Sequence, residues 1–174
     1  IIYRNASRIE QLISEMLNSS RPGELNLKKV QPAVLIDETL ELSIDRIQLR
    51  EIQLEKKVKG DLPDIYVDPE KLKMAFLNII INAIEAMETE AGCLRIEADT
   101  EGGHLVFQFT DNGKGIAQEE VDKLFDPFYT GKKGGMGLGL TSVQNILQSH
   151  KGGIEVKSKP GEGTTFAIYI PVGN

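Results

Sequence analysis

The stretch from Pro69 to Met87 constrains the fold of this chain more than any other feature of the sequence. It predicts a long helix that is apolar around nearly its whole circumference. Asp68-Pro69 supplies an N-cap residue followed by proline at the first helical position. A helix this apolar is typical of a buried element. At 100° per residue its polar exceptions share one narrow stripe, namely Lys71, Asn78, Asn82 and Glu85.

This polar stripe has two interpretations. The first is that the stripe faces water. The second is that it lines a polar cavity, because asparagine is a poor helix former and two buried carboxamides without partners would be costly. In the second case Asn82 offers a neutral oxygen to a Mg²⁺ ion that is held mainly by substrate phosphates.

A first glycine loop, Asp111-Asn112-Gly113-Lys114-Gly115, follows a predicted strand. Asn-Gly is a strong hairpin signal, but the residues from Ile116 to Val121 begin a helix and not a second strand. A carboxylate at a strand end suits a pocket that accepts hydrogen bonds from an exocyclic amine, and the glycines let a flat base approach the backbone. Taken alone, Asp-x-Gly-x-Gly is weak evidence.

A second glycine loop, Gly134 to Gly139, leads into a helix from Leu138 to Ser149. Backbone N–H groups at a helix N-terminus point toward anions, and glycine permits a phosphate to come close. The loop lacks the lysine of the P-loop pattern, and it lacks the third glycine of the dinucleotide-binding pattern, so it fits neither.

The segment between the loops is long and has little apolar periodicity, which is typical of a lid over a binding site or of a disordered loop. Phe125, Phe128 and Tyr129 could anchor it or contact a partner. Lys132 and Lys133 either reach phosphate oxygens or form a solvated charge pair.

The remaining pattern predicts a compact α/β unit from Glu24 onward. Its expected strands are 25–30, 52–58, 65–67, 94–99, 105–110, 154–158 and 164–170, and its other expected helices are 32–49 and 118–124. Phe166, Ile168 and Ile170 mark the inward face of the last strand, and Thr164 shares that face. Thr164 could therefore assist Asp111 in binding a base, directly or through water.

Bulk composition sets broad limits on the class of protein. The formal charge of −6 argues against a nucleic-acid partner, and no apolar run approaches the roughly 18 residues of a membrane span. One cysteine, Cys93, excludes an intramolecular disulfide, and a reducing, cytoplasmic setting is expected. His104 and His150 are interpreted as structural, with an imidazolium at position 150 complementing a helix C-terminus.

The N-terminal residues 1–19 predict an amphipathic helix in which Ile2, Ile9 and Met16 recur at intervals of seven. The stripe needs a partner, which is either the body of its own domain or the other half of a helical hairpin or dimer. The hairpin is favoured, since the pattern begins at Ile1 without a cap, and we expect the chain to be part of a longer protein.

From about Asn26 onward the chain resembles the ATP-binding catalytic domain of bacterial sensor histidine kinases, within the superfamily shared with DNA gyrase, the heat-shock chaperone and mismatch-repair ATPases. Residues 78–83 resemble the N box of that family, 111–115 its first glycine box, and 125–128 its F box. Residues 135–140 resemble the second glycine box, with Met136 where threonine is commoner. The compact lid and the stretch 82–87 are most similar to kinases of nitrogen regulation and sporulation.

The resemblance implies a two-layer α/β (α+β) sandwich of the Bergerat type, in which about three helices cover one face of a mixed, largely antiparallel sheet. One N-terminal helix, within residues 1–22, would be the second helix of a dimerisation and phosphotransfer hairpin, and residues 24–174 the catalytic domain. ATP would lie between the helix 69–87 and the lid.

The resemblance also assigns roles. Asn82 would hold Mg²⁺, Asn78 would support phosphate and metal, and both are the candidate catalytic residues. Asp111 would bind adenine, and Gly137 to Leu140 of the second glycine box would meet the phosphates. The family often has a basic residue at the position of Glu85. The motifs and the resemblance together give these candidate ATP-binding residues: Asn78, Asn82, Glu85, Asp111, Gly113, Gly115, Ile116, Phe128, Thr130, Lys132, Lys133, Gly135, Met136, Gly137, Leu138, Gly139, Leu140 and Thr164.

Three functions fit this pattern. The leading hypothesis is a protein-histidine kinase that transfers the γ-phosphoryl group of ATP to a histidine on a separate dimerisation helix, for onward transfer to a response regulator. If this chain is part of a longer kinase, as expected, it lacks that histidine and is a monomer or weak dimer, whereas the parent protein is a homodimer. The alternatives are a gyrase-like ATPase, whose relatives carry a glutamate base at the position of Asn78, and a regulatory module that binds nucleotide without catalysis.

Overall fold

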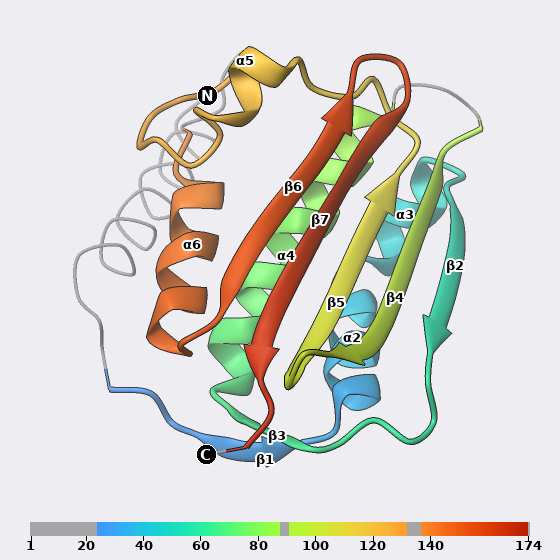
Figure 1. Ribbon diagram of the computed structural model, residues 1–174. Coiled ribbons are helices and arrows are strands. Elements are labelled where there is room, and N and C mark those ends of the chain that lie inside the picture. Colours follow the sequence, from blue (N-terminus) through green and yellow to red (C-terminus); the bar gives the residue numbers. More distant parts are fainter. Residues whose placement is uncertain (1–23, 88–90, 132–136, 174) are drawn as a thin grey trace, which may run out of the picture.

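The computed structural model describes residues 24–87, 91–131 and 137–173, which form two layers (Figure 1). In chain order the elements are β1 (Lys28–Val30), α2 (Pro32–Glu41), α3 (Ile44–Leu49), β2 (Gln53–Val58), β3 (Ile65–Val67), α4 (Pro69–Ala86), β4 (Cys93–Glu101), β5 (His104–Asp111), α5 (Gln118–Val121), α6 (Gly139–Ser149), β6 (Gly153–Lys159) and β7 (Gly163–Pro171). The predicted N-terminal helix lies outside the described residues. Among the described helices, none is long and apolar enough to cross a membrane.

The main sheet has five strands in the order β2-β4-β5-β7-β6. Strand β2 runs parallel to β4, and the other three pairs are antiparallel. The β4–β5 turn is formed by Gly102 and Gly103, which both have positive φ (57° and 79°), a conformation that is easy only for glycine. The prediction of a mixed, largely antiparallel sheet is therefore confirmed. A separate two-stranded ribbon, β1-β3, lies at one end of the molecule.

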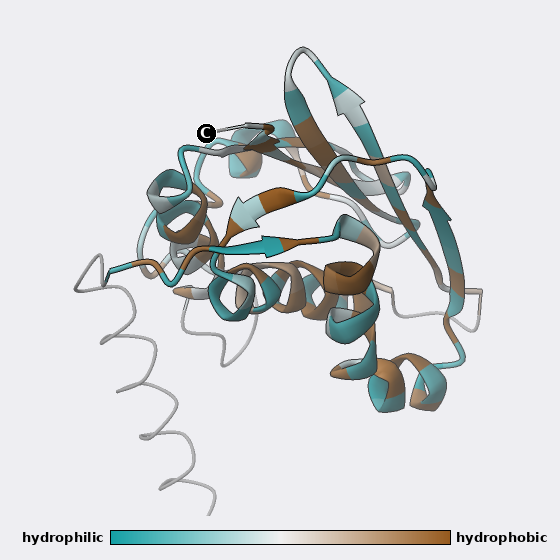
Figure 2. Ribbon diagram, turned by 90° about the horizontal axis from the view of Figure 1, so that it is seen from below, coloured by the Kyte–Doolittle hydropathy of each residue, from teal (hydrophilic) through white to brown (hydrophobic). Residues whose placement is uncertain are grey.

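The helices cover one face of the sheet, and the other face is open (Figures 1 and 2). On that helical side Phe76 of α4 packs between Phe107 and Phe109 of β5, with ring centroids 4.8 and 5.1 Å away. The open face carries charged pairs across strands, such as Arg95 Nε to Glu55 Oε2 at 2.8 Å. Alternation along the strands thus places one apolar face under α2, α4 and α6.

The sequence prediction was wrong about one helix. Residues 32–49 form two helices, α2 and α3, because the chain breaks at Leu42-Ser43. The buried Ser43 hydroxyl donates to the carbonyl oxygen of Leu40 at 3.2 Å, and the Ser43 backbone N–H donates to the same oxygen at 3.0 Å. Serine competes in this way with the backbone bonds that would continue a helix. Elsewhere the structure shifts the predicted ends by up to three residues.

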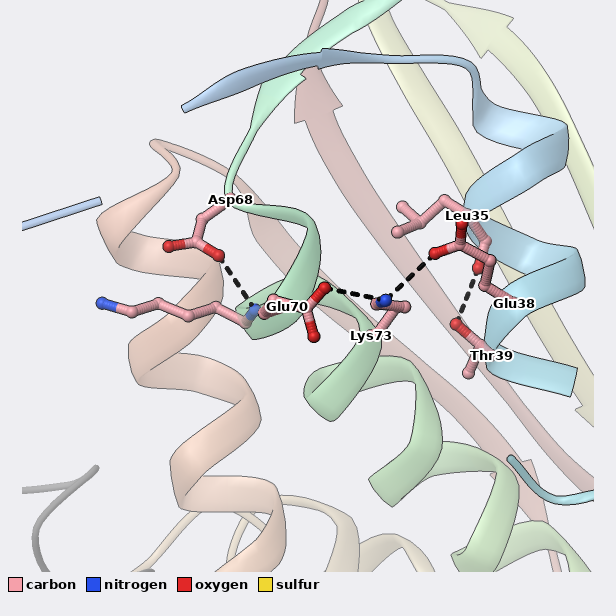
Figure 3. A network of polar contacts seen from close by, with 7 residues as sticks. Leu35, Glu38, Thr39, Asp68, Glu70 and Lys73 are labelled. Atoms are coloured by element: carbon pink, nitrogen blue, oxygen red, sulfur yellow. Dashed lines mark hydrogen bonds and ion pairs between the residues drawn. The ribbon is translucent and has the colours of Figure 1, made fainter. Parts of the chain in front are cut away.

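The N-terminus of α4 is fixed by Asp68, as the sequence predicted. One carboxylate oxygen accepts from the backbone N–H of Lys71 at 3.2 Å, and the other accepts from the backbone N–H of Asn26 at 3.0 Å. Figure 3 shows this cap together with Lys73, which bridges Glu70 and Glu38 and so ties α4 to α2. The long helix therefore begins at a rigid position.

His150 corrects a second expectation. Its Nε2 accepts from the backbone N–H of Asp68 at 2.9 Å, while Nδ1 lies 2.7 Å from the carbonyl oxygen of Ile146. A ring nitrogen can accept only when it carries no proton, so this geometry requires the neutral imidazole with its hydrogen on Nδ1. The histidine is structural, but it is not the imidazolium that the sequence suggested. It joins the end of α6 to the start of α4.

Candidate nucleotide-binding site

The two asparagines of the polar stripe are half-buried on α4, one turn apart, and Glu85 is exposed further along. Asn78 donates through Nδ2 to the carbonyl oxygen of Met74 at 3.2 Å, which fixes the side chain and leaves Oδ1 as its acceptor atom. A Cβ at Gly139 would lie 3.2 Å from that Oδ1. The end of the second glycine loop therefore lies beside the first asparagine.

Helix α6 begins at that glycine. Leu138 is the buried N-cap residue, and Gly139 and Leu140 begin the helix. Free backbone N–H groups at a helix start favour anions, and glycine keeps them accessible. Gly135 and Met136 of this loop, and Lys132 and Lys133 of the segment before it, lie outside the described residues.

The first glycine loop packs against the C-terminal end of α4. The Lys114 backbone N–H donates to the Ala86 carbonyl oxygen at 3.1 Å, and a Cβ at Gly113 would lie 2.6 Å from that same oxygen. On its other side Gly115, with φ of 67°, lies so near Lys159 that a Cβ would overlap the carbonyl oxygen. Both glycines are thus required by the close packing of the loop between α4 and the β6–β7 hairpin.

Asp111 ends β5 and is only 3% exposed. Its Oδ1 accepts from the backbone N–H of Gly113 at 2.8 Å. Burial raises the pKa of the Asp111 carboxyl above its ordinary value, and hydrogen bonds from the backbone N–H groups of Gly113 and Thr164 offset this only in part. A buried carboxylate in this position would be stabilised by a ligand that donates a hydrogen bond.

Thr164 lies directly across the β5–β7 ladder from Asp111 and is buried, as the face pattern predicted. Its hydroxyl oxygen is 2.8 Å from the hydroxyl of Ser158 on β6. Ser158 also accepts from the backbone N–H of Ile116 at 2.8 Å, so it connects the first glycine loop to β7. The sequence analysis missed Ser158. Its signal was available, because Ser158 shares the inward face of β6 with Ile154 and Val156, as Thr164 does on β7.

The F-box segment is tied to the start of α6. The Phe128 backbone N–H donates to the Gly137 carbonyl oxygen at 3.0 Å, and Thr141 Oγ1 donates to the Phe125 carbonyl oxygen at 3.1 Å. Phe128 has a positive φ of 67°, and its side chain is 70% exposed. Strained backbone of this kind is concentrated at functional segments. Thr130, also exposed, follows in the same segment.

The described candidates therefore gather on one side of the helical layer. Asn78 and Asn82 come from α4, Gly137 to Leu140 from the start of α6, and Asp111 to Ile116 from the loop after β5. The hollows on the open sheet face, which border Glu97 and Glu155, lie on the opposite side of the sheet and are separate from this site. The arrangement offers a buried acidic acceptor, a helix N-terminus and two amides, which suits a ligand with an amine-bearing ring and an anionic tail.

Comparison with known proteins bears directly on this arrangement. Residues 67–174 match the model of the family described as histidine kinase-, DNA gyrase B-, and HSP90-like ATPase. The chain belongs to this family.

Relatives of this ATPase domain include the sensor histidine kinase ZraS of Escherichia coli strain K12, which is 37% identical over 172 residues. The match covers 99% of the chain but 37% of that relative, so the chain spans little more than a third of its length. Among solved structures, full-length ShkA in complex with AMPPNP has a TM-score of 0.87 at 27% identity. The match covers 97% of this chain and 36% of the ShkA chain. The histidine kinase ThkA in complex with the response regulator TrrA has a TM-score of 0.81 at 26% identity, covering 98% of this chain and 49% of that one.

These comparisons confirm the predicted family and fold. The ATPase domain has the architecture of the ATP-binding catalytic domain of two-component sensor histidine kinases. They do not test the role of any single residue, so the assignments made from the sequence motifs remain predictions.

Proposed function

We propose that this domain binds Mg-ATP between α4, α6 and the first glycine loop, and transfers the γ-phosphoryl group to a histidine on a separate dimerisation helix. The observation that carries the proposal is the contact between motifs far apart in the sequence. The second glycine loop meets Asn78 at Gly139, and the first meets Ala86 at the end of the same helix. The AMPPNP complex of the structural relative ShkA supports an adenine nucleotide as the ligand.

In this proposal the chain acts mainly by holding the nucleotide in place. Asp111 accepts a hydrogen bond from the exocyclic amine of adenine, and Gly113 and Gly115 let the loop that carries the base pack closely against α4 and the β6–β7 hairpin. The backbone N–H groups at the N-terminus of α6 face the phosphate chain as donors, whereas Asn78, whose side chain presents an acceptor oxygen, would support the phosphates through Mg²⁺. Phosphoryl transfer depends on alignment and on neutralising charge, so positioned donors of this kind are the relevant catalytic groups.

The side chains present fit a magnesium ion that is shared with the nucleotide. Among the described residues no group of three or more His, Cys, Asp or Glu side chains could hold a metal ion by itself. Mg²⁺ in nucleotide sites takes few protein ligands and relies on phosphate oxygens and water. Asn82 would supply the protein oxygen, and Mg²⁺ would neutralise phosphate charge when bound.

The nature of Asn78 favours a kinase over an ATPase. Hydrolysis needs a base that takes a proton from water, and an amide cannot do this. The Asn78 amide is instead fixed by its hydrogen bond to Met74 and presents its oxygen toward Gly139. We therefore expect phosphate release well below about 1 per second, a low value for an enzyme.

The proposal is tested by mixing the chain with a histidine-bearing dimerisation hairpin from a sensor kinase and γ-labelled ATP. The expected result is Mg-dependent, acid-labile phosphohistidine on the hairpin, with little free phosphate. Asn82→Asp, which places a negative charge against the phosphates, should abolish or greatly weaken Mg-ATP binding. Asn145→Asp on α6 makes the same chemical change at a position outside the proposed site and should keep binding.

The outcomes separate the three candidate functions. Rapid phosphate release without phosphohistidine would favour the gyrase-like ATPase. Tight ATP binding with neither product, tested with hairpins from several kinases, would favour the regulatory module. Unchanged ATP affinity in Asn82→Asp would show that the site is misplaced on α4.

The wider assembly is also part of the proposal. Residues 1–22 would be the second helix of the dimerisation hairpin and residues 24–174 the catalytic domain. The parent would be a homodimer, with or without a membrane anchor, whose catalytic domain lies in the cytoplasm. A response regulator would receive the phosphoryl group, and the complex of ThkA with TrrA supports a partner of that class.

A further inference from the structure

The hydroxyl group of Ser158 lies at the centre of a small hydrogen-bond network beside Asp111. It is 2.8 Å from the backbone nitrogen of Ile116, 2.9 Å from the carbonyl oxygen of Gly163 and 2.8 Å from the hydroxyl of Thr164. The network determines which of these groups donates.

A serine hydroxyl has one hydrogen and two lone pairs. One lone pair accepts from the Ile116 N–H, and the hydrogen is directed to the Gly163 carbonyl oxygen. Only a lone pair remains for Thr164, so the Thr164 hydroxyl donates to Ser158. The reverse arrangement would need the single Ser158 hydrogen to leave the Gly163 carbonyl oxygen, to which it is directed at 2.9 Å.

Thr164 is thereby turned into an acceptor on its free side. Its hydrogen is held by Ser158, so toward any other group it can only accept, and Asp111 is its direct partner across β5 and β7. The Asp111 carboxylate is itself an acceptor. The pocket therefore presents two neighbouring acceptors to whatever part of a base lies there.

We propose, building on the nucleotide-binding function above, that Ser158 is a positioning residue that sets the specificity of the site for 6-aminopurines over 6-oxopurines. A 6-amino group brings two hydrogens, one for Asp111 and one for Thr164, directly or through a water. A 6-oxo group brings only lone pairs and would face two acceptors. Sites built around polar groups discriminate strongly against ligands that leave those groups unpaired.

The experiment compares the dissociation constants of ATP and inosine triphosphate by calorimetry. Inosine triphosphate carries a 6-oxo group but lacks the 2-amino group of guanine, so it isolates the change at position 6 more closely than GTP does. The variants are Ser158→Ala, Ser158→Thr and the control Ser149→Ala, whose hydroxyl donates to the Asn145 carbonyl oxygen at the far end of α6.

The wild-type chain should bind ATP more tightly than inosine triphosphate. In Ser158→Ala the freed Thr164 hydroxyl can rotate and donate to a 6-oxo group, so the preference for ATP should fall by about tenfold, the equivalent of one hydrogen bond. Ser158→Thr, which keeps the hydroxyl, should restore the preference, and Ser149→Ala should leave it unchanged.

A purely structural role for Ser158 would weaken both nucleotides equally and leave their ratio at the wild-type value, and that result would overturn the inference. If Ser158→Ala does not fold, Thr164→Val replaces the acceptor by a methyl group and should also lower the ratio; an unchanged ratio there is equally decisive. Failure of the wild-type chain to bind either nucleotide would instead overturn the proposed function.

Discussion

At the scale of single residues, the site combines groups that are costly by themselves. Asp111 is a buried carboxyl whose ionised form is held by two backbone N–H groups. Asn78 is fixed by Met74, and Phe128 keeps a positive φ through its bond to Gly137. Such groups persist where the surrounding structure holds them in place, and they are typical of binding sites.

Asp111 gives a prediction about protonation. Its pKa in the folded chain is raised above 3.8, the ordinary value, so the ionised group opposes folding. Its contribution to stability is therefore greatest below pH 3.8 and declines as the pH rises through the folded pKa. Carbon NMR of the carboxyl should show a midpoint above 3.8 in the free chain and a lower midpoint with saturating ATP, because the adenine amine favours the charged form. A midpoint that ATP leaves unchanged or raises would contradict adenine recognition by Asp111.

At the scale of elements, α4 is the support of the whole site. Its start is capped by Asp68, its middle carries the two asparagines, and its end accepts a hydrogen bond from Lys114 of the first glycine loop. Helix α6 lies against it and is joined to its start through His150. A change that loosens the start of α4 should therefore affect the positions of both α4 and α6, which flank the site.

The cap predicts a specific stability effect. Asp68→Ala should lower the free energy of unfolding by about 1–2 kcal/mol, since it removes the N-cap acceptor and the anchor of Asn26. Asp68→Asn should lose less, because asparagine also caps helices. Urea unfolding measures both changes, and Asp61→Ala, at an exposed aspartate in the turn after β2, is the control.

The same residue gives a pH dependence of opposite sign to that of Asp111. Burial opposes the charge on Asp68, but donation from the Asn26 and Lys71 backbone N–H groups outweighs it and lowers the pKa below 3.8. The stabilising contribution is complete above pH 3.8 and is lost as the pH falls through the folded pKa. Asp68→Asn should remove that part of the acid sensitivity, and an identical acid profile would contradict the cap.

At the scale of the whole molecule, the nucleotide site joins segments that are distant in sequence, so binding should stabilise the fold as a unit. A ligand at 100 times its dissociation constant adds about 2.7 kcal/mol to the free energy of unfolding. For a chain of 174 residues we expect a rise in Tm of about 5–10 °C with Mg-ATP. Scanning calorimetry measures it, with Asp111→Asn as a control that should show little shift. No shift with the wild-type chain at millimolar Mg-ATP would count against the site.

Much of this molecule could be predicted from the order of its residues. The apolar circumference of α4, the Asp68-Pro69 start and the inward face of β7 are local patterns, and local patterns depend only on helical and strand periodicity. The two glycine loops were also recognisable, because glycine followed by a helix start is a signal within a few residues.

The tertiary structure decided what periodicity cannot express. Ser43 broke a predicted helix through its own hydrogen bonds, and His150 became neutral because it accepts from a residue 82 positions away. Ser158 gained its role only when β6, β7 and the first glycine loop came together. Periodicity tells which way a side chain faces, whereas hydrogen-bond partners and protonation depend on neighbours that only the folded chain brings within reach.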